Sequence, residues 1–190
     1  LSDKISNRSI ALVEYQDEKY ANRYRKLLEV VTSAENKIFP GGECNLLVKS
    51  VVDNFYKLMA YKDEYEVARL YSIPSFLTDL RSKFDGPVRI KFNLAPSGLS
   101  RKDPVSGNPI KREFGGWVLI LFRILSRMRR LRGTALDPFG FTKERRRERK
   151  LVDEYEEMIT FISENLSKEN YKCAVNLAGL PDLIRGYGHV

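Results

Sequence analysis

The residues of this chain whose type and spacing are best suited to chemistry are basic. Residues 132–142 (RGTALDPFGFT) mix Gly, Pro and Phe, a composition typical of a loop with a defined shape, and such loops often carry function. A very basic segment, residues 143–150 (KERRRERK), follows directly and is predicted to begin a helix. We single out six side chains as a candidate partner-binding surface: Arg129, Arg132, Arg145, Arg146, Arg149 and Lys150. The apolar stripe of that helix begins only at Leu151. We therefore expect most of Arg145, Arg146, Arg149 and Lys150 to be exposed beside Arg129 and Arg132, forming one positive surface near residues 136–141.

The excess of positive charge is concentrated in one part of the chain. Residues 101–150 contain 15 Lys and Arg against five Asp and Glu, a net charge of +10, while the whole chain carries +8. A surface of this kind attracts an acidic partner, and the helix start at Thr142 could take a phosphate beside Arg145 and Arg149. Basic helix faces are also often merely solvated. A basic helical nucleic-acid-binding module is the alternative, but the basic run contains no aromatic residue for stacking and no helix-turn-helix or zinc-finger pattern is present.

Side chains that hold metals, cofactors or nucleophiles form no recognisable pattern. His189 is the only histidine, and Cys44 and Cys173 are the only cysteines, which we expect to be buried thiols. The motifs GxGxxG, GxxxxGK[ST] and GxSxG are missing, as is the Gly-Asp-Gly signature of thiamine diphosphate sites. We therefore predict no catalytic, cofactor-binding or metal-binding residue in this chain.

Two polar segments have competing structural interpretations. Asp137 could cap backbone amides of its own loop or pair with Arg132. Residues 61–66 (YKDEYE) could form a buried polar network or a contact with a neighbouring domain. They could equally form a solvated helix face with pairs such as Lys62–Glu66, each worth only ~0.2–0.5 kcal/mol.

The spacing of apolar residues predicts a mainly α fold, a compact multi-helix domain. Helices are expected at residues 10–36, 46–71 with a kink near 61–63, 76–84 capped by Ser75, 117–130, 143–165 capped by Thr142, 167–178 capped by Ser167, and 181–186. Residues 88–92 alternate as in a strand and 95–113 are rich in turn residues, so we predict a small β-hairpin-like insertion around residues 88–112.

The helix at 117–130 is apolar nearly all round at its start, which predicts a central, buried element. We expect it to contact the apolar stripe of the 143–165 helix. The expected core residues are Trp117, Phe122, Leu125, Leu151, Tyr155, Met158 and Ile162.

The composition indicates one helical domain spanning residues 1–190. Hydrophobic residues make up 43% of the chain, enough for a core, and no signal peptide or membrane span is recognisable. We expect a cytoplasmic protein without a membrane partner. Because the chain begins at Leu1 rather than Met, we expect a fragment of a longer polypeptide.

Three stretches resemble the C-terminal helical domain of the fused indolepyruvate (2-oxoacid):ferredoxin oxidoreductase family. They are residues 57–71 (KLMAYKDEYEVARLY), residues 132–142 followed by 144–149 (ERRRER), and residues 184–190 (IRGYGHV). They occur in the same order as in the family and span most of the chain. One departure is Gly116, where we expect Pro in the family.

The resemblance implies a parent enzyme that oxidatively decarboxylates indolepyruvate or a related aryl 2-oxoacid. Such an enzyme uses thiamine diphosphate, magnesium and iron–sulfur clusters, forms an acyl-coenzyme A and reduces ferredoxin. Those cofactors belong to other segments of the family's polypeptide, so the resemblance implies a non-catalytic structural and docking domain without a complete active site. Its partners would be the other domains of the polypeptide and acidic ferredoxin, or the phosphates of coenzyme A, at the basic face.

Overall fold

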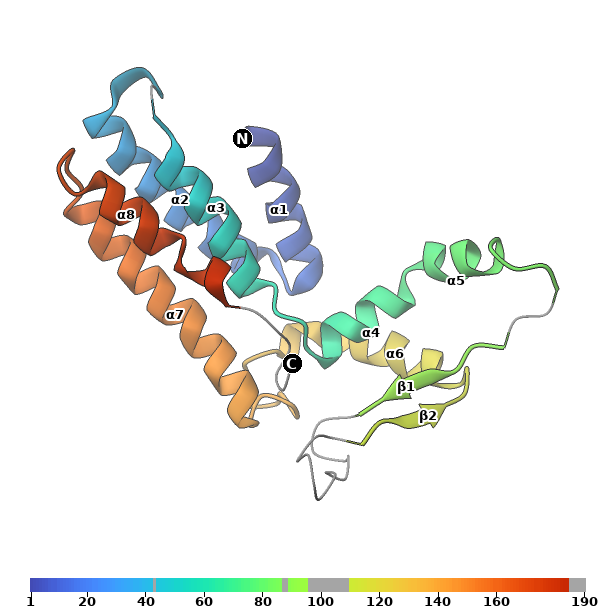
Figure 1. Ribbon diagram of the computed structural model, residues 1–190. Coiled ribbons are helices and arrows are strands. Elements are labelled where there is room, and N and C mark those ends of the chain that lie inside the picture. The colour runs from blue at the N-terminus through green and yellow to red at the C-terminus, as the bar shows by residue number, and fades with distance from the viewer. Residues whose placement is uncertain (43, 87–88, 96–109, 185–190) are drawn as a thin grey trace. The chain divides into compact units, whose positions relative to one another are not determined.

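The chain is mainly α-helical, as the apolar spacing predicts. A computed structural model describes residues 1–42, 44–86, 89–95 and 110–184, in which there are eight α-helices and one two-stranded antiparallel sheet (Figure 1). We expected one domain. The structure divides the chain into two compact units, which we describe separately: the first unit contains residues 1–61 and the chain from residue 146 onward, and the second unit contains residues 62–145.

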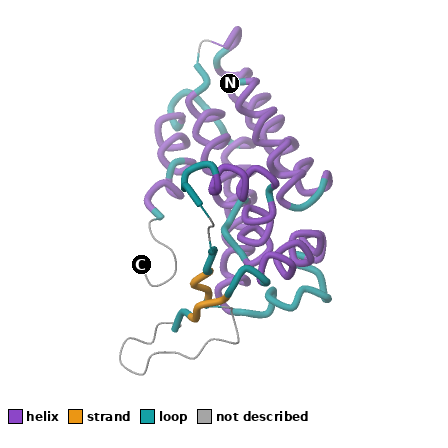
Figure 2. The backbone as a smooth tube through the Cα atoms, turned by 90° about the vertical axis from the view of Figure 1, so that its right-hand side faces the viewer, coloured by secondary structure: helices purple, strands orange, loops and turns teal. Residues whose placement is uncertain are grey.

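The first unit is a group of helices around one hydrophobic core. Its helices are α1 (Ser2–Tyr15), α2 (Glu18–Ile38), α3 (Leu46–Met59), α7 (Lys143–Glu164, from residue 146) and α8 (Tyr171–Ala178), with 3-10 turns at Pro40–Gly42 and Leu180–Leu183. Helix α8 lies alongside α3 (Figure 1). Figure 2, coloured by secondary structure, shows that helices make up most of the described chain. The rings of Tyr24, Phe55 and Tyr155, from α2, α3 and α7, stack in the core with centroids 5.9 and 5.8 Å apart. These three helices therefore bury the stripes that their apolar spacing predicts.

A buried carboxylate ties two helices of the first unit together. Glu35, near the end of α2, is 1% exposed and accepts hydrogen bonds from the backbone N–H groups of Leu47 (2.9 Å) and Val48 (3.2 Å) in the first turn of α3. The Tyr171 hydroxyl donates to the same carboxylate. Glu35 thus caps the next helix along the chain, and a negative charge at a helix N-terminus is stabilising.

Two predicted helices are each divided in two by an aspartate. The prediction of one helix over residues 10–36 is wrong, because the helix breaks before Asp17. Asp17 caps α2 by accepting a hydrogen bond from the Tyr20 backbone N–H at 2.8 Å. The stretch 46–71 breaks between α3 and α4 (Glu64–Ser72), where Asp63 caps α4. The predicted kink near 61–63 is a complete break.

The second unit packs helices against a short hairpin. It contains α4, α5 (Pro74–Arg81), β1 (Phe92–Leu94), β2 (Arg112–Phe114), α6 (Val118–Arg127) and a 3-10 turn at Met128–Leu131. The strands pair with Phe92 opposite Phe114. Ala68, Phe92, Val118 and Phe122 form the core, and the Tyr71 ring packs on it. The hairpin-like insertion is confirmed, but its first strand begins at Phe92 and does not include residues 89–91. Residues 87, 88 and 96–109 lie outside the described residues.

Helix α6 is not the buried central element that its apolar composition predicts. Only Val118 and Phe122 are buried, whereas Trp117 is 61% exposed. Val118 and Phe122 belong to the core of the second unit, whereas Val152, Tyr155, Ile159 and Ile162 of α7 belong to that of the first, so the expected contact between α6 and α7 stays a prediction. Of the expected core residues, Phe122, Tyr155 and Ile162 are buried, and Leu125, Leu151 and Met158 are partly buried. The reason is that α6 packs one face on α4 and the hairpin and leaves its opposite face uncovered.

Other predicted boundaries shift by a few residues. Helix α5 starts with Pro74 in its first turn and is not capped by Ser75, and the helix expected from residue 167 begins at Tyr171. The helix expected at 181–186 is the 3-10 turn Leu180–Leu183. Residues 185–190, including His189, lie outside the described residues. The Thr142 cap of α7 is confirmed by a 3.3 Å hydrogen bond from the Arg145 backbone N–H.

The cysteines and membrane criteria give two further findings. Both cysteines are free thiols, as expected, but Cys44 is half-buried and Cys173 is exposed, so their expected burial is wrong. Within the described ranges, no helix has the length and apolar character needed to cross a bilayer.

Candidate functional site: a buried polar network

The site builds on the two segments that the sequence marks as polar, both within the second unit. Asp63 stands immediately before α4, Tyr65 lies in the first turn of α4, Arg132 follows the 3-10 turn, and Asp137 lies in the loop that leads to α7. All four side chains are buried, with Arg132 5% exposed and the other three 3% or less. Buried polar groups are stable only when they are paired, so their partners define what this site does.

Asp63 and Arg132 form a two-pronged ion pair. The Arg132 guanidinium donates from Nε to Asp63 Oδ2 at 2.6 Å and from Nη2 to Oδ1 at 2.8 Å. Asp63 Oδ1 also accepts from the Glu66 backbone N–H at 2.8 Å, which caps α4. The same carboxylate therefore begins the helix and neutralises the buried guanidinium. Charge-assisted bonds with this fork geometry are among the strongest in proteins.

Asp137 organises its loop from within. Its carboxylate accepts hydrogen bonds from the backbone N–H groups of Gly133 (2.8 Å) and Phe139 (3.1 Å) and from the Tyr65 hydroxyl (3.0 Å). Gly133 has φ of +75°, a backbone conformation that favours glycine. The expectation that Asp137 caps backbone amides is confirmed, while the alternative pairing with Arg132 is wrong, because Arg132 pairs with Asp63.

Tyr65 contacts both parts of the network, because its hydroxyl donates to Asp137 and its ring lies against the guanidinium that pairs with Asp63. Its ring lies 5.5 Å from the Arg132 guanidinium carbon and packs edge-on against Phe139, with centroids 5.3 Å apart. Burial, together with the neighbouring charge of Asp137, raises the pKa of the Tyr65 hydroxyl well above its usual value. Tyr65 therefore stays protonated at neutral pH and acts as a hydrogen-bond donor.

Gly140 closes the loop over Asp137. A Cβ atom on residue 140 would lie 2.5 Å from Asp137 Oδ2 and 2.8 Å from Cγ, closer than any ordinary contact. Only glycine fits here without displacing the carboxylate. The glycine therefore permits the backbone to pass directly over the network.

A second ion pair borders the network. Arg145 Nε lies 3.4 Å from Glu64 Oε2, with side-chain exposures of 10% and 17%. Glu66, also in the first turn of α4, pairs with Arg69 rather than with Lys62, through 2.8 Å bonds to Nε and Nη2. Of the two interpretations of residues 61–66, the buried polar network is therefore the one that the structure supports.

The six predicted partner-binding side chains differ in exposure. Arg146 and Lys150 are exposed, as expected, and Arg129 and Arg149 are half-buried. The expectation of exposure is wrong for Arg132 (5%) and Arg145 (9%), because acidic residues of α4 and its cap draw both side chains inward. For the same reason the Arg145 side chain is occupied by Glu64 and does not offer a phosphate site.

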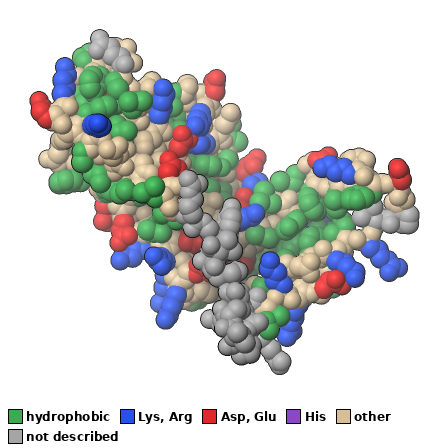
Figure 3. Space-filling view, in the orientation of Figure 1, with side chains coloured by type: hydrophobic (Ala, Val, Ile, Leu, Met, Phe, Trp, Pro, Cys, Tyr) green, Lys and Arg blue, Asp and Glu red, His purple; other side chains and the backbone are tan. Residues whose placement is uncertain are grey.

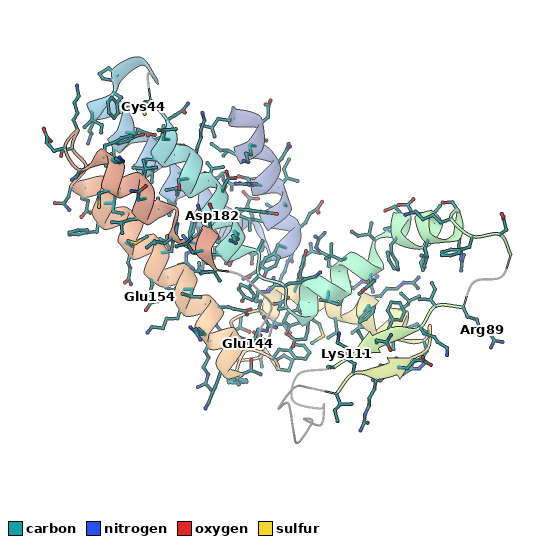
Figure 4. All side chains as sticks on the ribbon, viewed as in Figure 1. Cys44, Arg89, Lys111, Glu144, Glu154 and Asp182 are labelled. Atoms are coloured by element: carbon teal, nitrogen blue, oxygen red, sulfur yellow. The ribbon has the colours of Figure 1, made fainter. Side chains whose placement is uncertain are left out.

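The exposed charges on the surface are distributed rather than gathered. Figure 3 shows Lys and Arg at several separate places on the visible face of each unit. On α7, Lys150 pairs with Glu154 at 3.1 Å, and both Glu144 and Glu154 project from the helix (Figure 4). Acidic residues thus interrupt the basic run, which weakens the positive surface expected from residues 143–150.

Sequence reasoning missed two members of the site. Asp63 and Tyr65 were recognised only as part of a polar segment, and their partners lie 69 and 72 residues away. The signal that could have found them is a carboxylate at a helix cap together with an arginine directly after a helix end. Among the described residues, no group of His, Cys, Asp and Glu could hold a metal ion.

The fold and site define a mainly α protein in which a buried Asp–Arg and Tyr–Asp network holds a loop against a helix. The chain belongs to the family described as "Family of unknown function (DUF6537)", whose sequence model matches residues 1–190. No curated protein and no solved structure matches the chain.

Proposed function

We propose that the chain is a non-catalytic structural and docking domain of a thiamine-diphosphate- and iron–sulfur-dependent indolepyruvate (2-oxoacid):ferredoxin oxidoreductase. The observation that supports the proposal is that two of the segments that resemble the family supply the side chains of the buried polar network. Residues 57–71 supply Asp63 and Tyr65, and residues 132–142 supply Arg132 and Asp137. Two of the three segments that resemble the family thus meet in one buried network.

The chemistry of that network supports a structural role. Every carboxylate oxygen of Asp63 and Asp137 accepts at least one hydrogen bond, and the Tyr65 proton is committed to Asp137. A general acid or base needs reach to a reacting group, which buried and mutually satisfied side chains do not have. The network holds the shape of the loop, and the cofactors of the parent enzyme would belong to its other segments.

The docking part of the proposal rests on the exposed basic side chains at the start of α7. Arg146 and Lys150 lie on the same helix face and reach solvent. Positive charge here would speed association with acidic ferredoxin or another acidic surface of the polypeptide, and salt would screen the effect.

The test uses the natural polypeptide that contains this chain. It should reduce ferredoxin in the presence of indolepyruvate and coenzyme A. The isolated chain should be folded but inactive, and thiamine diphosphate should leave its Tm unchanged, since a ligand that does not bind the native state cannot stabilise it. A natural polypeptide that consumes no 2-oxoacid would overturn the family assignment, and turnover by the isolated chain would overturn the non-catalytic role.

Charge reversal tests the docking role separately. The double variant Arg146→Glu/Lys150→Glu should slow ferredoxin reduction at low ionic strength and flatten its salt dependence. The matched control is Lys26→Glu/Lys37→Glu, which makes the same charge change at two exposed lysines of α2. Equal rates in both variants would remove ferredoxin docking from this surface.

The alternative, a nucleic-acid-binding module, loses part of its support. Two of its basic side chains, Arg132 and Arg145, are buried in ion pairs. Binding to DNA or RNA that falls steeply with salt would restore it.

A further inference from the structure

The outer face of α6 is apolar and open to solvent. Trp117, Ile120, Leu121 and Ile124 are 61%, 63%, 44% and 52% exposed, and their spacing places them on one side of the helix. The opposite side of α6 supplies Val118 and Phe122 to the core of the second unit. A helix with apolar residues on both sides usually has a partner on each.

Trp117 occupies the start of this face in a defined position. Its ring packs edge-on against Phe114 of β2, with centroids 6.1 Å apart. The hairpin thus supports the first side chain of the stripe and keeps it at the surface. An exposed tryptophan at the end of an apolar stripe is typical of an anchor residue in a protein interface.

Helix α6 and the residues that flank it in sequence carry only positive charge. Residues 115–136 contain five arginines and no Asp or Glu. Arg123 and Arg127 are exposed on α6, four residues apart and next to the stripe, and no ion pair among the described residues involves either of them. The nearest acidic residue before the helix, Glu113, pairs with Lys91 at 2.8 Å. Both arginines are exposed and can therefore meet acidic groups of a partner.

We propose that this outer face of α6, with Trp117, Ile120, Leu121 and Ile124 at its centre and Arg123 and Arg127 along its edge, docks an amphipathic protein segment that is apolar at its centre and acidic along one border. Charge complementarity selects this occupant, because apolar contact supplies the affinity and the arginines select acidic side chains. The inference does not depend on which enzyme the chain belongs to.

Two other occupants fit the charges less well. A second copy of the chain would place two identical arginine-bordered stripes against each other. Helix α6 would contribute no acidic residue to such an interface, so the charges of the arginines would not be offset. A membrane-surface helix carries its cations on the face opposite its apolar side. In α6 that opposite face is packed into the unit, and the two arginines lie along one edge.

Trp117 gives a direct test, because it is the only tryptophan of the chain. The probe is a synthetic tryptophan-free helical peptide with Leu at positions i, i+3, i+4 and i+7 and Glu along one border. A second peptide carries Lys in place of Glu. The acidic peptide should shift the Trp117 emission to shorter wavelength and bind at least about tenfold more tightly than the basic peptide at low salt.

Variants identify the face and the charges. Ile124→Asp should abolish binding, whereas Phe161→Asp, a matched change at a residue of α7 that is 66% exposed, should leave it unchanged. Arg123→Glu/Arg127→Glu should reverse the preference toward the basic peptide, while Lys26→Glu/Lys37→Glu, the same charge change at two exposed lysines of α2, should not. Both isoleucine and arginine variants change exposed side chains, so circular dichroism should remain that of the parent chain.

Three results would overturn the proposal. Equal binding of the two peptides, or no emission shift with the acidic one, removes the charge-selected docking. An emission shift that grows with the concentration of the chain alone identifies a second copy as the occupant. A shift with phosphatidylserine vesicles but not with the acidic peptide identifies a membrane surface instead.

Discussion

Replacing Arg132 by Met should destabilise the second unit strongly. The side chains of Arg132 and Asp63 are each 3% exposed, so both charges are removed from water and compensate each other. Met keeps the length of the side chain but leaves the Asp63 carboxylate buried without its guanidinium, a change that typically costs ~3–5 kcal/mol. The lost stacking on Tyr65 adds about 0.5–1 kcal/mol. Against a total stability of ~5–15 kcal/mol, this is a large fraction.

A double-mutant cycle separates the pairing energy from helix capping. Asp63→Asn removes the charge but retains a side chain that caps helices as well as Asp does. If the two residues act mainly on each other, the double variant should lose less stability than the two single variants together, with a coupling energy of about 0.5–3 kcal/mol.

The measurement is urea unfolding followed by circular dichroism, with hydrogen exchange of the α4 amides reporting on the second unit. Arg130→Met is the matched control: this exposed arginine of the same 3-10 turn should change stability by no more than about 0.5 kcal/mol. A cost below about 1 kcal/mol for Arg132→Met, or simple additivity in the cycle, would refute the reasoning.

Two further predictions concern glycine packing and ionisation. Gly140→Ala should lower the free energy of unfolding by ~1–3 kcal/mol, because the added Cβ displaces the Asp137 carboxylate. The control Gly116→Ala, where no atom lies within 4 Å of the added Cβ, should be close to neutral in the same unfolding assay. Equal effects of the two variants would contradict this prediction. Burial raises the pKa of Tyr24 to about 12, so its neutral hydroxyl stabilises the folded state fully below pH ~10. Ionisation of Tyr24 should therefore lower the free energy of unfolding by about 3 kcal/mol between pH ~10 and ~12. The Tyr24→Phe variant should show a shallower decline over this range. An unchanged pH profile in that variant would exclude Tyr24 as the cause.

Much of the helical structure follows from local sequence. The stripes that include Leu12, Tyr24, Phe55 and Tyr155 are buried because apolar side chains at helical spacing form one continuous face. The cap at Thr142 follows from the same local rules, since a hydroxyl before a helix satisfies a nearby backbone N–H. The hairpin was predictable from its turn residues, although its boundaries were not.

Composition could not decide how α6 packs. Apolar residues nearly all round its start predict burial, yet Ile120 and Ile124 are more than half exposed. A sequence shows that a face is apolar, but it does not show whether the partner that covers it lies within the same chain. The first expectation assumed an internal partner, and the structure places only one side of the helix against the unit.

The polar network was beyond local reasoning for a different physical reason. The sequence by itself determined that residues 61–66 are a polar segment, that residues 132–142 form a loop, and that Asp137 can cap that loop. Only the tertiary structure decided that Arg132 pairs with Asp63 and that Tyr65 donates to Asp137. Charges interact through space, so which arginines become buried and which stay at the surface depends on the acidic groups that folding brings beside them.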